Sequence, residues 1–153
     1  MPLIEIKTLI NADIKTSFDL SRNIDFHTAS LEHSNEKAIA GKTSGLIGLN
    51  EWVTWEAKHF GINQQLTSKI TEFENPHYFV DEMVSGAFKS FRHEHVFQSK
   101  NNQTLMTDKF QFESPFGILG KLANVLFLKR YMTNLLTTRN AFLKKKAEEL
   151  SNI

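Results

Sequence analysis

Two histidines spaced two residues apart, His93 and His95, are the residues of this sequence best suited to chemistry. In an extended strand, side chains at i and i+2 share a face, which would place both imidazoles on one side, roughly 7 Å apart. Phe91 and Phe97 share that face, so we expect it to point inward. Because histidine titrates near neutral pH, such a pair can orient a carbonyl or hydroxyl group, or act as general acid and base.

Two further polar side chains are candidates for the same site. A strand predicted over residues 50–60 places His59 on its more apolar face with Trp55, and Asp108 shares a face with Phe110. In the functional interpretation, these groups converge with the two histidines in an otherwise apolar pocket. In the alternative, which is commoner for any single histidine, each imidazole is a buried group satisfied by a neighbouring carboxylate or backbone atom, or the strand faces outward near its end.

Metal and nucleophile chemistry are less favoured. Zinc binding by His93, His95, His59 and Asp108 needs four groups to meet about 2 Å from the ion, with a second shell behind them. The chain has no cysteine, which excludes disulfides, thiolate nucleophiles and thiolate metal sites. No Gly-x-Ser-x-Gly elbow occurs, and the full phosphate-loop motif Gly-x-x-x-x-Gly-Lys-Ser/Thr is also absent, because Glu36 stands where the first glycine before Gly41-Lys42-Thr43 would have to be. We therefore expect no metal and no obligatory cofactor, and His93 and His95 remain only candidates for a catalytic role.

Length and composition limit the classes of protein and partner. A chain of 153 residues is expected to form one domain over residues 1–153, with a core of its own. Charged residues make up 23% and the formal net charge is +1, which argues against a nucleic-acid partner. The start of the chain lacks a basic, then apolar, signal segment, and no stretch of about 18 apolar residues occurs. We expect a cytoplasmic protein without stable membrane insertion.

The strands and helices that carry these residues can be predicted from a change in the hydrophobic periodicity of the sequence. Apolar and polar residues alternate from Asn50 to Glu113, which indicates strands, and the pattern from Pro115 to Glu148 is helical. Before them come a predicted first strand, a short helix capped by Asn11 or Asp13, a second helix and a possible short strand. The expected ranges are strands Leu3–Ile10, Lys37–Ala40, Asn50–Phe60, Asn63–Phe73, His77–Val84, Ser90–Ser99 and Gln103–Glu113, and a second short helix Asn23–His33.

A long C-terminal helix should begin where Ser114 supplies an N-cap and Pro115 occupies the first helical position. Between Leu122 and Leu136 apolar residues cover more than one narrow stripe, so we expect this helix to be buried along most of its middle. A sheet with one apolar face followed by such a helix indicates an α+β fold in which the sheet wraps round the helix.

Four stretches strengthen this expectation: VTWEAKHFG from Val53, FVDEMVSGAF from Phe79, RHEHVF from Arg92, and SPFG from Ser114. Together with the element order, they resemble bacterial SRPBCC proteins of the START and polyketide cyclase/dehydrase superfamily, in the subgroup labelled cyclase or ligand-binding. The resemblance covers nearly the whole chain. It implies a helix-grip fold, a curved antiparallel sheet of six to seven strands gripping the C-terminal helix, with a hydrophobic cavity between them.

Members of that superfamily bind lipids, sterols, quinones, polyketides or plant hormones, and a minority catalyse cyclisation or dehydration. Others act on a partner protein, so fold does not decide function, and no fixed catalytic set carries over. We expect binding of a small hydrophobic or amphipathic ligand, with a cyclase or dehydratase using the cavity histidines as one alternative and an interaction module without ligand as another. No protein partner is assigned.

The aromatic positions leave a similar choice, since they would either wall a cavity or fill a solid core. For the ligand-binding hypothesis the candidate residues are Trp55, His59, Phe79, Phe91, His93, His95, Phe97, Asp108, Phe110, Phe112, Leu122, Leu126 and Met132.

Overall fold

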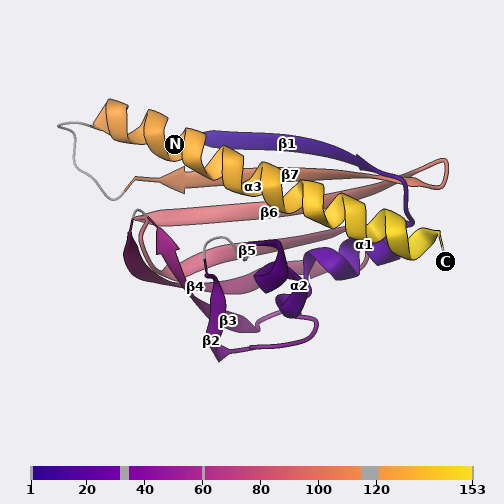
Figure 1. Ribbon diagram of the computed structural model, residues 1–153, viewed down its shortest axis with the longest axis horizontal. Helices are drawn as coiled ribbons and strands as arrows, with labels where there is room; N and C mark the ends of the chain where they lie inside the picture. Colours follow the sequence, from indigo (N-terminus) through magenta and orange to yellow (C-terminus); the bar gives the residue numbers. More distant parts are fainter. Residues whose placement is uncertain (1, 32–34, 60, 115–120, 153) are drawn as a thin grey trace.

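The computed structural model describes residues 2–31, 35–59, 61–114 and 121–152, with residues 121–124 described by their backbone alone. These residues form seven strands and three helices (Figure 1). In chain order they are β1 Leu3–Ile10, α1 Ile14–Ser21, α2 Ile24–Ser30, β2 Lys37–Gly41, β3 Trp52–His59, β4 Ile62–Glu74, β5 Tyr78–Ser85, β6 Ser90–Lys100, β7 Gln103–Glu113 and α3 Lys121–Ser151.

All seven strands form one antiparallel sheet in the order β1-β7-β6-β5-β4-β3-β2. Strands β2 to β7 follow one another as a meander, and β1 completes the sheet by pairing with β7. The long helix α3 crosses one face of the sheet, and α1 and α2 lie on that same face beside its C-terminal half (Figure 1). The predicted helix-grip α+β fold is confirmed.

The two short helices close one end of the concave face. Asp13 accepts a hydrogen bond from the Thr16 amide at 3.2 Å, so of the two predicted caps it is Asp13 that starts α1. Phe18 of α1 is fully buried, with ring centroids 5.5 Å from Phe79 and 5.3 Å from Phe97. Helix α2 ends at Ser30 with Leu31 as its C-cap, so it is shorter than predicted, and the predicted residues 32–33 lie outside the described residues.

A two-residue turn sets the register of β6 against β7. Asn101 and Asn102 both have positive φ, 47° and 69°, as a tight hairpin turn with right-handed strand twist requires. Asparagine adopts this left-handed conformation more readily than most residues. The resulting pairing runs from Lys100↔Gln103 back along both strands. Every inward side chain of β6 therefore meets a defined neighbour on β7.

Helix α3 differs from its prediction in where it is buried. Its predicted start at Pro115 lies outside the described residues. Leu126 and Phe127, in the half expected to be buried, are 61% and 56% exposed. The buried stripe lies further along the helix, at Leu136, Arg139, Asn140, Leu143 and Ala147. The prediction of a buried middle was wrong, because the first half of α3 stands over a hollow instead of a filled core. No helix among the described residues is long and apolar enough to cross a membrane.

Candidate functional site

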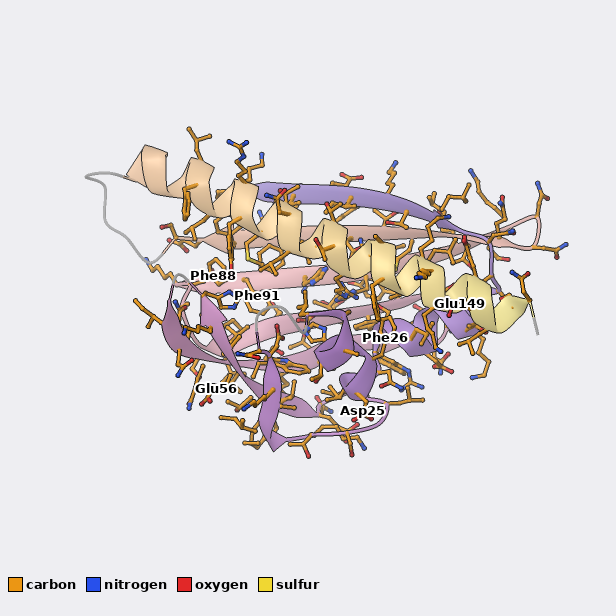
Figure 2. All side chains as sticks on the ribbon, viewed as in Figure 1. Asp25, Phe26, Glu56, Phe88, Phe91 and Glu149 are labelled. Atoms are coloured by element: carbon orange, nitrogen blue, oxygen red, sulfur yellow. The ribbon has the colours of Figure 1, made fainter. Side chains whose placement is uncertain are left out.

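A cavity of about 490 Å³ lies between the concave face of the sheet and α3. Most of its wall is aromatic or aliphatic and comes from both layers. Figure 2 shows Phe91 of β6 and Phe88 of the turn between β5 and β6 on the side of the N-terminal half of α3, at the far end from Glu149. The apolar lining includes Val53, Trp55, Ala57, Ile70, Phe79, Phe88, Phe91 and Phe110 from the sheet side and Leu128, Met132, Leu135 and Leu136 from α3.

The cavity reaches the surface near the turns that join β3 to β4 and β5 to β6. Ile62 and Ala87 line it there and are both exposed. Close to this opening His59 of β3 contacts the hydroxyl group of Tyr131 on α3, and the two rings meet edge to face. Burial raises the pKa of Tyr131. This contact ties the sheet to the helix across the cavity.

Deeper in the cavity, strand register brings four ionisable side chains together on three adjacent strands. Asp81 of β5 lies directly opposite His93 of β6, and His95 of β6 lies directly opposite Asp108 of β7. The alternating burial of β6 turns both imidazoles inward, with ring centroids 3.8 Å apart. His95 also stacks on Phe79 at 4.1 Å between ring centroids. The predicted inward face of β6 is therefore the one the structure shows.

The hydrogen bonds in this cluster run diagonally between strands. Nε2 of His93 lies 2.8 Å from Asp108 Oδ1, and Nε2 of His95 lies 2.7 Å from Asp81 Oδ1. Nδ1 of His95 is 3.4 Å from Asp108 Oδ1, yet it is buried and makes no hydrogen bond with the described part of the chain. That approach is a charge attraction, because the two atoms are poorly aligned for a hydrogen bond.

Asp108 is the buried centre of the cluster. It has no exposed surface, and its carboxylate accepts hydrogen bonds from Asn140 Nδ2 at 2.7 Å and from Arg139 Nη1 at 3.4 Å. The other end of the Arg139 guanidinium donates to Ser21 Oγ of α1 at 2.9 Å. A buried carboxylate is stable only when paired and hydrogen-bonded in this way. Asp108 thus joins the sheet to α3, and Arg139 joins α3 to α1.

Within the cluster, the pKa values of His93 and His95 are shifted in opposite directions. Burial, together with the nearby charge of His95, lowers the pKa of His93 to about 4, so His93 is neutral near pH 7. Burial alone would lower the pKa of His95 as well, but attraction to Asp108 and Asp81 outweighs it and raises that pKa.

The pKa values of the Asp81 and Asp108 carboxyl groups are both lowered. Burial would raise the pKa of Asp108, yet its histidine and arginine neighbours hold it well below the ordinary value. Burial would likewise raise the pKa of Asp81, and the hydrogen bond with His95 lowers it instead. Both carboxylates are ionised near neutral pH, and each faces an imidazole.

Solved structures share this architecture over almost the whole chain. Crystal structures of TTHA0849 from Thermus thermophilus (16% identity, TM-score 0.78, covering 98% of this chain and 99% of that one) and of Ara h 8.0201 (7% identity, TM-score 0.67, covering 93% and 97%) are similar to it. So is ginseng major latex-like protein 151 from Panax ginseng (14% identity, TM-score 0.65, covering 95% and 97%).

This shared architecture agrees with the START/SRPBCC-like fold that the sequence resemblance implied. At these identities the likeness establishes the fold alone. No protein-family model and no curated protein sequence matches the chain.

Eight of the predicted site residues lie on the cavity wall. They come from β3, β5, β6, β7 and α3, and they are Trp55, His59, Phe79, Phe91, His93, His95, Phe110 and Met132. The structure does not bring His59 to the other two histidines, because three steps along the sheet separate β3 from β6. The predicted convergence of His93, His95, His59 and Asp108 is therefore only partly right.

Four other predicted residues are placed elsewhere. Asp108 lies behind the histidines, not on the wall. Phe97 packs on Phe18 of α1, which covers the sheet at that point, and Phe112 is fully buried, 5.4 Å from Phe88 between ring centroids. Leu126 faces outward, since it is two helical positions, about 200°, from the cavity-lining Leu128. The side chain of Leu122 lies outside the described residues.

Three residues of the polar cluster were missed by sequence reasoning. Asp81 shares a strand face with Phe79, so the period of two could have placed it inward. Arg139 and Asn140 lie three and four residues after Leu136, on the same helical stripe. Their signal was a polar interruption of an apolar stripe, which is as typical of an exposed turn as of a buried network.

Proposed function

We propose that the protein binds a small hydrophobic or amphipathic molecule in the cavity between the sheet and α3. The observation that carries this proposal is the hollow itself, about 490 Å³ in volume, with a mostly apolar wall that includes the Asp81, His93 and His95 cluster and a separate pair of His27 with Glu36. Cavities of roughly 300–1,000 Å³ with few polar groups are the usual form of small-molecule sites. A lipid, a quinone or a polyketide-like molecule has the required character.

The apolar and the charged residues of the cavity wall have different roles in this proposal. Enclosing about 200 Å² of apolar ligand surface is worth about 5 kcal/mol at about 25 cal/mol per Å². The rings of Trp55, Phe91 and Phe110 supply much of the apolar surface. The Asp81 carboxylate, 21% exposed on the cavity side of β5, and the imidazoles beside it would fix the orientation of the ligand's polar end.

The test fills the cavity without touching the polar cluster. Ala57 is buried and lines the cavity, so the larger side chain in Ala57→Phe would occupy part of the volume. Glu56→Phe adds the same group on the opposite face of β3 and is the matched control. We expect saturable binding of a fluorescent fatty acid by the wild type and Glu56→Phe, and at least about tenfold weaker binding by Ala57→Phe. Equal binding by all three folded proteins would rule the cavity out as the site.

A second function, acid–base catalysis of the cyclase or dehydratase type, is supported by the opposite pKa shifts of His93 and His95. Neighbouring groups whose environments push their pKa values apart are suited to separate base and acid roles. In a dehydration the neutral imidazole would take a proton from carbon, and a protonated partner would give one to the departing hydroxyl group, releasing water.

Separate measurements of binding and turnover distinguish the two functions. For an enzyme, His93→Asn should still bind the fluorescent fatty acid but lose turnover of a β-hydroxy-ketone substrate by about 100-fold or more. For a binding protein, the wild type itself should leave such substrates unchanged. If the folded wild type shows neither binding nor turnover, the remaining hypothesis is an interaction module that has no ligand.

A further inference from the structure

Three nitrogen and oxygen donors converge on one side of the polar cluster. Asp81, His93 and His95 each offer a donor atom, and these three atoms lie within 4.8 Å of one another. Asp81 Oδ1 is 2.7 Å from His95 Nε2 and 3.8 Å from His93 Nδ1. All three residues line the cavity. The donors come from two paired strands, which hold them more rigidly than a loop would.

Asp108 occupies the opposite side of both imidazoles. Its Oδ1 is 2.8 Å from His93 Nε2 and 3.4 Å from His95 Nδ1, so the same carboxylate faces the far nitrogen of each ring. A carboxylate behind a histidine that fixes its ring and tautomer is the usual outer shell of a metal-binding histidine. Asp108 is itself held by Asn140 and Arg139.

The ring of His93 presents its two nitrogens to two different carboxylates. Nε2 lies 2.8 Å from Asp108 Oδ1, whereas Nδ1 faces Asp81 Oδ1 at 3.8 Å, which is too long for a direct hydrogen bond. Nδ1 is therefore placed to bind an ion that it shares with the Asp81 carboxylate.

We propose that Asp81, His93 and His95 bind a divalent transition-metal ion, with Zn²⁺ as the expected occupant and Asp108 as the residue that orients both imidazoles. Two imidazoles and one carboxylate form a frequent zinc ligand set in which the fourth position stays open. Here that position would face the cavity. Ligand atoms about 2.1 Å from a tetrahedral ion lie about 3.4 Å from each other. Asp81 Oδ1 and His95 Nε2, now 2.7 Å apart, must therefore separate slightly, and His93 Nδ1, now 3.8 Å from Asp81 Oδ1, must move closer.

Local charge is compatible with such an ion. Metal binding requires both imidazoles to be neutral. Asp81 and Asp108 then carry two negative charges, and Arg139, 3.4 Å from Asp108, offsets one. The cluster then has a net charge of −1, and a divalent ion changes it to +1. An anionic or carbonyl oxygen of a cavity ligand would complete both the coordination and the charge. The metal site itself needs no organic ligand, so it can be tested apart from the proposed function.

The experiment measures metal binding by the whole folded chain with no organic ligand present. After treatment with a chelator, the protein is titrated with Zn²⁺ by calorimetry and with Co²⁺ by visible absorption. We expect one ion per chain and the intense absorption of a low-coordinate Co²⁺ site. His93→Gln, His95→Gln and Asp81→Asn should each abolish this binding, and Asp108→Asn should weaken it by about 10- to 100-fold.

His27→Gln is the matched control, because His27 also lines the cavity and pairs with a carboxylate, Glu36, at 2.7 Å, but lies outside the proposed site. It should bind Zn²⁺ and Co²⁺ as the wild type does. The proposal is overturned if the wild type binds neither ion stoichiometrically, if binding survives in Asp81→Asn, or if His27→Gln loses binding to the same degree. If the buried histidine variants fail to fold, Asp81→Asn alone tests the proposal, because the side chain of Asp81 is partly exposed to the cavity and its replacement should disturb folding less.

Discussion

At the scale of single residues, the stability of the cluster depends on a buried ion pair. Arg139 is 4% exposed and joins Asp108 of β7 to Ser21 of α1. Removing one partner of such a pair leaves the other charge buried without compensation, which commonly costs about 3–5 kcal/mol. Asp108 keeps its hydrogen bonds from His93 and Asn140, so the lower end of that range applies here.

We predict that Arg139→Met lowers the free energy of unfolding by about 3 kcal/mol. Arg130→Met is the matched control, since it makes the same change on the same helix at an exposed position, and it should stay within about 0.5 kcal/mol of the wild type. Urea unfolding followed by circular dichroism measures both. Equal losses in the two variants would show that the buried pair does not hold the helix to the sheet.

At this scale sequence reasoning predicted the inward direction of both histidines and named Asp108 as a neighbour, but it missed Asp81 and Arg139. The alternation of β6 was enough to turn His93 and His95 inward, because side-chain direction in a strand is local. Their partners Asp81 and Asp108 depend on the registers of β5 against β6 and of β6 against β7, which are set by turns and by the whole sheet. Arg139 comes from a helix that is distant in sequence, so nothing local to the strands could reveal it.

At the scale of elements, the two halves of α3 differ in what they contact. The C-terminal half packs on β1 and α1 through Leu143 and Ala147, both without exposed surface. The half before it presents Leu128 and Met132 to the cavity and leaves Leu126 outside. Helical period alone predicted an apolar helix but not which of its faces is covered, because a hollow beneath a helix has no signature in its own sequence.

We therefore predict that Leu143→Ala costs about 3 kcal/mol of unfolding free energy, as large-to-small changes in a filled core do. Leu126→Ala removes the same atoms from an exposed position and should change stability by less than about 0.5 kcal/mol. Thermal and urea unfolding of the two variants provide the comparison. A larger loss for Leu126→Ala would mean that the first half of α3 is buried after all.

The turn between β6 and β7 allows a second test at this scale. Because Asn102 has a φ of 69°, Asn102→Gly should retain or slightly raise the melting temperature. Asn102→Val, with a branched side chain in the left-handed region, should destabilise the protein by about 1–2 kcal/mol. If Asn102→Gly and Asn102→Val had the same melting temperature, the left-handed conformation of this turn would not matter for the register that places His95 opposite Asp108.

At the scale of the whole molecule, the buried apolar residues that the structure describes form two clusters instead of one continuous core. One is centred on Phe18 and Phe97 under α1, and the other on Phe110 and Phe112 under α3. Residues from both clusters, including Phe79 and Phe110, line the cavity. The alternation of strands followed by a helix was enough to predict the fold, but whether its aromatics wall a cavity or fill a core depends on how the sheet and the helices meet.

A molecule that fills this space should stabilise the native state. A ligand at about 100 times its dissociation constant adds about 2.7 kcal/mol to the free energy of unfolding, if it does not bind the unfolded chain. We predict that fatty acids or quinones of suitable size raise the melting temperature of the wild type and of Glu56→Phe by several degrees, and that of Ala57→Phe much less. Differential scanning calorimetry with and without the ligand measures this shift.

The most direct test of the central claim, that the hollow holds a small apolar molecule, is native mass spectrometry of the protein taken straight from cells. We predict a complex heavier than the bare chain by one small organic molecule, which is released on denaturation, is present in Glu56→Phe and is depleted in Ala57→Phe. The bare chain alone, with no uptake of added fatty acid, quinone or polyketide-like compounds by the folded protein, would contradict the claim.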